Sequence, residues 1–154
     1  MRIVLQRVAR GEVSVNGRSV GRIERGYVLL AGFHREDTPE ALEWMAEKIV
    51  SLRLFPDPSD ASAEERPSSF SRDINEVAGS ILVVSQFTLY GDTRKGRRPS
   101  FIDAAPPVIA IPLYDRFVEL LRERTRGSVE TGAFGAMMEV SLVNDGPVTL
   151  ILER

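Results

Sequence analysis

Four segments in the first 33 residues have the hydrophobic pattern of β-strands. Residues 2–8 alternate well enough to predict a strand, with Ile3, Leu5 and Arg7 on one face. Two β-rich runs flank Asn16-Gly17, a dipeptide typical of a tight hairpin turn. Residues 26–33 form a continuous apolar run, as expected of a central strand. We therefore predict a four-strand antiparallel meander at the start of the chain.

A helix is predicted next, because apolar residues recur three and four positions apart beyond Pro39. Asp37 or Thr38 can cap this helix, and Pro39 suits its first turn. Glu40 completes a capping box with Asp37. We expect the helix to end near residues 54–56. Its buried stripe consists of Leu42, Met45, Ala46, Ile49 and Val50.

Loops, a second helix and further strands follow. Residues 57–72 are rich in Pro, Ser, Asp and Glu, which predicts a flexible loop insertion without a chemical role. Residues 80–92 begin as an apolar strand and turn polar within the same strand. A second helix is predicted over 110–124, with Pro112 near its first turn and Gly127 just past its end. Its inner face is formed by Leu113, Phe117, Leu120 and Leu121.

The order of these elements indicates the fold class. Strands and helices follow one another without βαβ alternation, which indicates an α+β fold. The chain shows no internal repeat and no linker between two cores, so residues 1–154 are predicted to form a single domain. No apolar run reaches about 18 residues, so no membrane span is expected. The first eight residues read as a strand and not as a signal peptide, and we expect a cytoplasmic protein.

The composition removes several kinds of chemistry. The chain has no cysteine, which excludes disulfides, thiolate metal sites and cysteine nucleophiles. His34 is the only histidine, and a lone histidine cannot supply the clusters that zinc sites use. We interpret His34 as a solvated loop residue. A hydrolase built on this chain must rely on backbone groups, hydroxyls or the substrate itself, with no metal and no other cofactor.

The chain closes on two apolar runs, 140–143 and 148–152, which flank Asn144-Asp145-Gly146-Pro147. Glycine and proline ordinarily mark turns, so one interpretation is a four-residue loop in which Pro147 stiffens the entry to the last strand. The other interpretation is that this backbone is itself a binding device. Spacing alone leaves both interpretations open.

Ser85-Gln86-Phe87-Thr88 presents two hydroxyls and an amide directly after the apolar run 81–84. A strand that leaves the core can carry such residues, because neighbouring strands satisfy the hydroxyls. Alternatively, the segment forms the floor of a pocket, where hydroxyls and exposed N–H groups hold a carbonyl oxygen as it becomes negative.

A basic cluster follows this segment. Arg94, Lys95, Arg97 and Arg98 surround Gly96 in a chain whose formal net charge is −2. Such a run is usually a solvated loop tip. In an acidic protein it is also a candidate phosphate contact, because arginine can grip a phosphate with two hydrogen bonds.

Phe134, Met137 and Met138 lie between small residues in the segment before the last strands. Large apolar residues in such a place usually fill the core. They can also form the wall of a pocket that accepts varied side chains, because methionine adapts its shape.

Two segments of the chain closely resemble the signature segments of the D-aminoacyl-tRNA deacylases, formerly called D-tyrosyl-tRNA deacylases. The family patterns SQFTL and N-x-GPVT stand unaltered at Ser85–Leu89 and Asn144–Thr149. The segments LQRV, EVSVNG, RLFPD and TGAF also look like family segments. The resemblance covers nearly the whole chain. Its main departure is the loop at 57–72, which is longer than is usual in bacterial members.

The resemblance implies antiparallel sheets in a partly closed β-barrel, with two main helices packed on one side. It implies hydrolysis of the ester that joins a D-amino acid, or glycine mischarged on tRNA as in Gly-tRNA(Ala), to its tRNA. It also implies a homodimer with active sites at the subunit interface, and neither a membrane nor a DNA partner. A Gly146-cis-Pro147 element from one subunit would reach into the pocket of the other and reject L-aminoacyl-tRNA.

The resemblance also suggests roles for single residues. We assign the N–H groups of Phe87 and Thr88 to the developing oxyanion, with Ser85 and Gln86 shaping the substrate end. Thr88 Oγ is the obvious side-chain nucleophile, but no base is available to activate it, so we expect attack by water helped by the terminal ribose 2′-hydroxyl. The expected substrate-binding residues are Gly146, Pro147, Asn144, Phe134, Met137, Met138 and Arg7, of which Arg7 braces the Gly-Pro loop. The expected tRNA-binding residues are Arg94, Lys95, Arg97 and Arg98.

Two rival interpretations remain. One keeps the fold and drops the catalysis, which leaves a non-catalytic dimeric module that binds the tRNA acceptor end through the basic loop. The other is a metal-dependent hydrolase, which the short supply of metal ligands disfavours.

Overall fold

The computed structural model describes residues 1–57, 59 and 70–154. Its sheet grows from one long strand, β1 (Arg2–Val15), which pairs antiparallel with β2 (Arg18–Ile23) and β3 (Gly26–Gly32). The four-strand prediction for this region was wrong, because the segment between Val8 and Glu12 does not turn. It stays paired with the last strand of the chain, so two predicted strands are one.

Two parallel pairs make the sheet mixed. β3 pairs parallel with β4 (Ser80–Ser85), and β4 pairs parallel with β5 (Val129–Thr131). A helix lies in each connection, α1 (Pro39–Ser51) in the first and α2 (Pro107–Arg124) in the second, and returns the chain in the same direction. The expectation of antiparallel sheets without βαβ units is corrected here. Long loops beside each helix separate it from the neighbouring strands in the sequence, so the alternation of strands and helices was not apparent.

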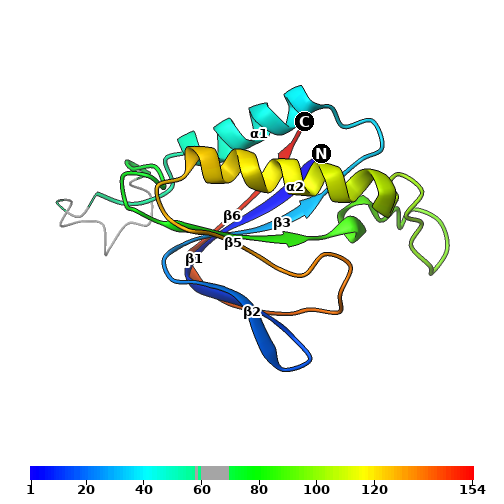
Figure 1. Cartoon of the computed structure of the whole chain (residues 1–154), viewed down its shortest axis with the longest axis horizontal. Coiled ribbons are helices and arrows are strands. Elements are labelled where there is room, and N and C mark those ends of the chain that lie inside the picture. Colours follow the sequence, from blue (N-terminus) through cyan, green and yellow to red (C-terminus); the bar gives the residue numbers. More distant parts are fainter. Residues whose placement is uncertain (58, 60–69) are drawn as a thin grey trace.

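The partly closed barrel with two helices on one side is confirmed. The strand order is β2-β1-β3-β4-β5, and β6 (Glu139–Glu153) pairs with β1. Figure 1 shows α1 and α2 side by side over one face of the sheet, with β2 and the connection into β6 below it. The main core lies between the sheet and the helices, and a smaller apolar cluster that includes Val13 and Leu82 fills the other side.

Helix α1 begins as predicted, with Thr38 as its N-cap and Pro39 in its first turn. Thr38 caps α1 and accepts a hydrogen bond from the Ala41 amide at 3.4 Å, while Asp37 accepts from the His34 amide at 2.8 Å. Asp37 is therefore hydrogen-bonded within the preceding turn, and the predicted capping box with Glu40 does not form. The predicted stripe of α1 is buried throughout: Leu42, Met45, Ala46, Ile49 and Val50.

α2 starts three residues earlier than predicted, at Pro107, and Pro112 lies inside the helix. Proline suits the first helical position, and Pro107 occupies it. Gly127 has another role than ending the helix, because a Cβ there would stand 2.1 Å from the carbonyl oxygen of Gly79. Glycine at 127 allows this close approach of two backbones.

The final apolar runs form one strand and not a hairpin. Both halves of β6 pair with β1, with Asn144 opposite Val8 and Val148 opposite Arg7. Residues 145–147 therefore bulge out of the ladder, and the Gly146-Pro147 peptide bond is cis. The interpretation of this segment as a four-residue turn was wrong, because the chain does not reverse here.

Within the described residues, no helix is both long and apolar enough to cross a membrane. Most of the predicted loop insertion at 57–72 lies outside the described residues.

Candidate active site

A cavity of about 440 Å³ opens at the carboxyl ends of β3 and β4. Apolar side chains make most of its wall, and its polar lining comes from Ser85 at the end of β4 and from the segment that follows. The cavity therefore suits a ligand with an apolar part and a carbonyl group. Its lining residues are Ala31, Phe33, Val84, Ser85, Gln86, Phe87, Thr88, Ala105, Ala110, Phe134, Gly135, Ala136, Met137, Met138 and Val140.

The polar rim of the cavity is a short 3₁₀-helix, η1 (Phe87–Tyr90). The prediction of one strand over 80–92 was wrong, because β4 ends at Ser85 and the Gln86 amide makes the last ladder bond, 2.8 Å from the carbonyl oxygen of Ala31. Beneath η1 lies Gly32, where a Cβ would stand 3.0 Å from the Gln86 carbonyl oxygen. This glycine lets the chain turn tightly across the end of β3.

The first N–H groups of a helix have no partner inside it. For the amides of Phe87 and Thr88, no acceptor occurs among the residues that the structure describes. Both residues are exposed at the cavity, so their N–H groups are free to bind an oxygen. The Thr88 hydroxyl accepts a hydrogen bond from the Gln86 side-chain amide. An amide cannot remove a proton from a hydroxyl, so this contact orients Thr88 without activating it.

The opposite wall combines core and pocket roles. Phe134 packs edge-on against Tyr114, with ring centroids 5.5 Å apart, and Met138 packs against the smaller core cluster. Met137, by contrast, is 92% exposed. The two interpretations of this segment are therefore both right, because the same turn fills the core and lines the cavity.

The side chain of Arg7 is buried, with only 4% exposed, on the face of β1 that it shares with Leu5. Its Nε donates to the Asp145 carbonyl oxygen at 3.0 Å and lies 3.2 Å from the Asp145 carboxylate. Its Nη1 donates to the Leu54 carbonyl oxygen, and its guanidinium carbon lies 5.9 Å from the centre of the Phe55 ring. Arg7 thus ties the bulge at 145–147 to the segment that follows α1.

The bulge itself needs glycine. Gly146 has φ of +123°, and a Cβ there would stand 3.0 Å from both Arg7 Nη2 and Val148 Cγ2. Any other residue would be strained in this conformation. The neighbouring Asn144 accepts a long hydrogen bond of 3.5 Å from Gln6.

The predicted site residues fall into two separate groups. Ser85, Thr88 and the turn with Phe134 line the cavity, but Asn144, Gly146, Pro147 and Arg7 do not. Arg7 pairs with Tyr27, four residues before the cavity residue Ala31 on β3, which corresponds to about 13 Å along the strand. Within one chain, the bulge and the cavity are apart.

The basic cluster lies on the loop after η1. Arg94 is engaged within the protein, because its Nη2 and Nε lie 2.7 and 2.9 Å from the Asp92 carboxylate. Hydrogen bonds from Arg94 lower the pKa of Asp92 to about 2, so this carboxylate is ionised at neutral pH. Lys95, Arg97 and Arg98 are exposed and form no ion pair with any described residue.

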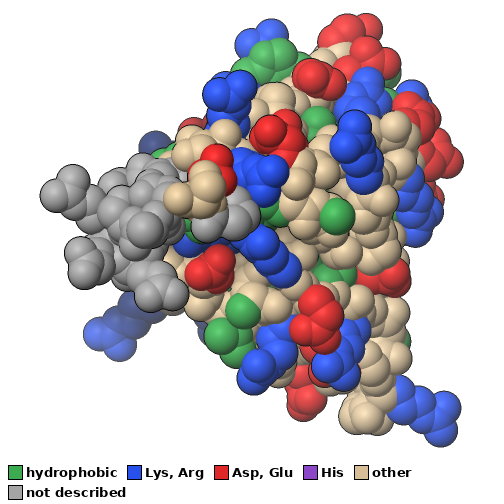
Figure 2. Space-filling model, turned by 90° about the vertical axis from the view of Figure 1, so that its left-hand side faces the viewer, with side chains coloured by type: hydrophobic (Ala, Val, Ile, Leu, Met, Phe, Trp, Pro, Cys, Tyr) green, Lys and Arg blue, Asp and Glu red, His purple; other side chains and the backbone are tan. Residues whose placement is uncertain are grey.

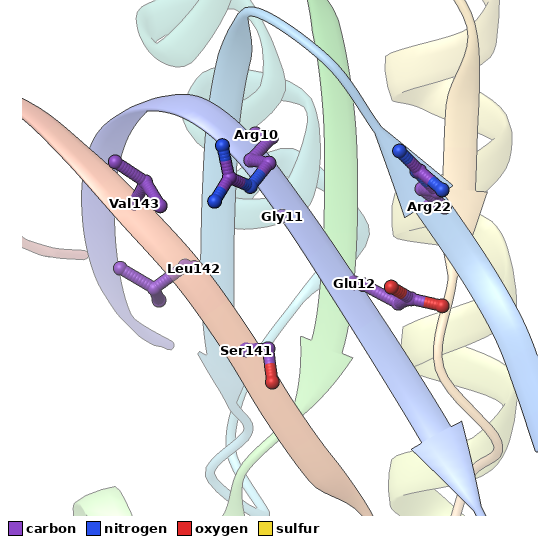
Figure 3. Close-up of a pocket in the computed structure, with 7 residues that line it drawn as sticks. All are labelled: Arg10, Gly11, Glu12, Arg22, Ser141, Leu142 and Val143. Atoms are coloured by element: carbon purple, nitrogen blue, oxygen red, sulfur yellow. The ribbon is translucent and has the colours of Figure 1, made fainter. Parts of the chain in front are cut away.

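A second hollow of about 300 Å³ lies over β1, β2 and β6 (Figure 3). None of the predicted site residues lines it. The residues of the hollow are Arg10, Gly11, Glu12, Arg22, Ser141, Leu142 and Val143.

On the face drawn in Figure 2, basic and acidic side chains are mixed, without a large patch of one sign.

Sequence reasoning missed the small residues that make room for a ligand. Ala31, Ala105, Ala110 and Ala136 all line the cavity, and none carries a chemical signature. His34 was expected to be solvated. It is half-buried instead, with its ring centroid 5.5 Å from that of Tyr90 and its Nδ1 accepting from the Glu36 amide.

Comparisons with known proteins agree on one family. Residues 4–153 match the family described as D-Tyr-tRNA(Tyr) deacylase. The chain is 53% identical to the D-aminoacyl-tRNA deacylase of Rippkaea orientalis (strain PCC 8801 / RF-1), over the full length of both chains. It is 49% identical to that of Chlorobaculum parvum (strain DSM 263 / NCIMB 8327), over 99% of this chain and 97% of the relative.

Solved structures give the same fold. A c-Myc DNA unwinding element binding protein superposes with a TM-score of 0.89 at 41% identity, over 100% of this chain and 99% of that one. A probable eukaryotic D-amino acid tRNA deacylase superposes with a TM-score of 0.79 at 24% identity, over 98% and 97% of the two chains. By its sequence matches, the chain belongs to the D-Tyr-tRNA(Tyr) deacylase family.

Proposed function

We propose that this chain hydrolyses the ester bond of D-aminoacyl-tRNA in the cavity beside η1. The observation that carries the proposal is the pair of free N–H groups on Phe87 and Thr88 at the rim of that cavity. None of the described residues that line it is an acid, a histidine or a lysine, so the arrangement suits a reaction driven by position and by stabilisation of an oxyanion. The curated relatives are named D-aminoacyl-tRNA deacylases, which supports the same activity.

In the proposed reaction the ester carbonyl oxygen points at the two N–H groups. Water attacks the carbonyl carbon, and the negative charge that forms on the oxygen is stabilised by these donors. The neighbouring 2′-hydroxyl of the terminal ribose relays a proton: it accepts one from the attacking water and passes its own to the ribose 3′-oxygen. The C–O ester bond then breaks, the ribose 3′-oxygen leaves and takes up the proton, and free amino acid and tRNA result.

We further propose that the bulge at Gly146-Pro147 serves the cavity of a second copy of the chain. The bulge does not line its own cavity, yet it is held firmly by the buried Arg7. The strand that carries it exposes apolar side chains, Val140, Val143 and Ile151, which suits an interface. The proposed assembly is a homodimer with both active sites at the contact.

Such a main-chain clamp explains selectivity for the D configuration. If the clamp holds the substrate ammonium while η1 holds the carbonyl, an L side chain points into the protein backbone. A D side chain, or the hydrogen of glycine, clears it. A thousandfold preference requires about 4 kcal/mol, which a rigid steric clash supplies. The proposed substrates therefore include glycine mischarged on tRNA.

The exposed cations beyond η1 are proposed to contact the tRNA acceptor end. We expect the double variant Arg97→Ala, Arg98→Ala to raise KM for D-Tyr-tRNA several-fold while kcat stays unchanged. The slope of log KM against log salt concentration is expected to fall by about 1.5 to 2, because two phosphate contacts are lost. Steady-state kinetics between low and physiological salt measure this slope. An unchanged slope would show that these two residues do not contact phosphate.

A DNA partner is disfavoured. One relative of known structure is named for binding a DNA unwinding element. This chain has a formal net charge of −2, and its basic cluster is confined to one short loop. That distribution suits the end of an RNA better than a long duplex, and we propose no DNA partner. The proposed location is the cytoplasm, where aminoacyl-tRNA is used.

The proposal is tested by giving the purified protein D-Tyr-tRNA, L-Tyr-tRNA and glycyl-tRNA in parallel. We expect release of D-tyrosine and glycine, no release of L-tyrosine, and the same rates in the presence of a chelator. Binding of all three without release would instead favour the non-catalytic acceptor-end module. Release that stops with chelator would favour a metal-dependent hydrolase.

A further inference from the structure

We propose that Arg2 is a positioning residue for the proposed reaction, because it holds η1 in the place where its N–H groups meet the substrate. The inference rests on the proposed function of η1 and adds a residue that touches neither the cavity nor the bulge. Arg2 is the first residue of β1, and Glu153, the last residue of β6, lies opposite it in the ladder.

Three contacts connect Arg2 to its surroundings. Its Nη1 donates a hydrogen bond to the carbonyl oxygen of Leu89, within η1. Its guanidinium carbon lies 5.0 Å from the centre of the Tyr90 ring, the last residue of η1. Its Nε is paired with the carboxylate of Glu153. One side chain therefore links the edge strand β6 to the second half of η1.

The 3₁₀-helix needs such external support. It has only four residues, and the last carbonyl groups of any helix lack partners within it. A hydrogen bond from a guanidinium to one of these carbonyls is stronger than a neutral one. The aromatic face of Tyr90 adds attraction for the same cation, and burial together with the charge of Asp37 raises the pKa of Tyr90 to about 12, so the ring stays neutral.

The other side of η1 is fixed by close packing. Gly32 of β3 lies against it, and a Cβ there would stand 3.1 Å from Leu89 Cβ and 3.4 Å from Tyr90 Cδ2. The helix thus rests on β3 on one side and is held by Arg2 at its end. Because Leu89 follows Thr88 directly, a shift of the Leu89 carbonyl moves the Phe87 and Thr88 amides with it.

Because Arg2 lies at the surface, a positioning role can be distinguished from a purely structural one. Its side chain is 37% exposed and that of Glu153 is 58% exposed, so their ion pair adds little to the stability of the fold. Loss of Arg2 should therefore change the geometry of η1 much more than the melting temperature. The expected signature is a fall in kcat at nearly constant KM.

The test compares Arg2→Ala, Arg2→Lys and Glu153→Gln with the wild-type protein on D-Tyr-tRNA. We expect Arg2→Ala to lower kcat about tenfold, with KM within about twofold, because misplaced groups lose orientation but not binding. Arg2→Lys keeps one donor and is expected to recover part of the loss, and Glu153→Gln is expected to lose less than Arg2→Ala. The matched control is Arg22→Ala, which breaks another exposed pair, with Glu24 at 3.2 Å, away from η1.

Hydrogen exchange provides a readout that does not depend on activity. Amides of residues 86–91 are expected to exchange faster in Arg2→Ala than in the wild type or Arg22→Ala, with the melting temperature nearly unchanged. Wild-type kcat in Arg2→Ala, or unaltered exchange at 86–91, would overturn the inference. If the wild type releases no D-tyrosine, the proposed function fails, and the exchange measurement still decides whether Arg2 holds η1.

Discussion

Arg7→Ala is expected to lower kcat/KM for D-Tyr-tRNA about a hundredfold and the free energy of unfolding by about 2 to 3 kcal/mol. The side chain is 4% exposed and donates to the carbonyl oxygens of Asp145 and Leu54. Its loss leaves both oxygens without this partner. The contact with Leu54 is buried and that with Asp145 is half-buried, and an unpaired buried acceptor costs about 1 to 3 kcal/mol. The bulge at 145–147 then loses its tie to Leu54 in the segment after α1, so the clamp moves out of position.

Urea unfolding and steady-state kinetics measure the two effects of this change. Arg7→Lys separates charge from geometry, because a single ammonium cannot donate in both directions as the guanidinium does. We expect Arg7→Lys to recover little activity. Arg10→Ala, which removes an exposed arginine three residues along the same strand, serves as the control. Wild-type kcat/KM in Arg7→Ala would show that the bulge does not depend on this contact.

Gly146→Ala is expected to lower kcat/KM by about a hundredfold or more. Gly146 has φ of +123°, which an alanine adopts only with strain of about 1 to 3 kcal/mol. The added methyl group would also stand 3.0 Å from Arg7 Nη2 and from Val148 Cγ2. The bulge and the buried arginine must then both shift, which alters the surface offered to the substrate ammonium.

Gly17→Ala is the matched control for Gly146→Ala. Gly17 also has positive φ, +74°, but a Cβ there meets nothing within 4 Å. In this variant the backbone of a hairpin turn is strained, but the added methyl group causes no steric clash. The turn is also far from the proposed clamp. We expect it to be less stable than the wild type and fully active. Equal activity losses in both glycine variants would mean that strain alone, and not the shape of the bulge, lowers the rate.

Sequence patterns correctly predicted elements that form through interactions between residues close together in the chain. The stripe from Leu42 to Val50 is buried as its spacing indicated, and Asn16-Gly17 makes the predicted hairpin. The direction of strands was not accessible in the same way. β3 and β4 pair across a gap of 47 residues, from 33 to 79. No sequence feature near either strand indicates that the two strands run parallel.

The site was predictable in its parts but not in its arrangement. The family segments pointed to Thr88, Phe134 and Gly146, of which the first two line the cavity and the third lies in the bulge away from it. That Ser85 ends a strand while Phe87 begins a 3₁₀-helix depends on Gly32 from another strand, a tertiary contact that no local pattern reports. The same is true of Arg2, whose hydrogen bond to Leu89 joins residues 87 positions apart.

The central proposal, that one copy of the chain supplies the clamp and another the cavity, can be tested by mixing two defective variants. Ala136→Trp fills the cavity and leaves the bulge intact, whereas Gly146→Ala damages the bulge and leaves the cavity open. Each variant alone is expected to be nearly inactive on D-Tyr-tRNA. Native mass spectrometry first establishes that subunits exchange and that mixed dimers form.

After exchange at equal concentrations, half of the dimers are mixed, and each mixed dimer has one site with an intact cavity and an intact clamp. The account predicts recovery of about a quarter of the wild-type activity per subunit. If the clamp instead serves the cavity of its own chain, every site in every mixed dimer keeps one defect. Mixed dimers that form and stay inactive would contradict the account.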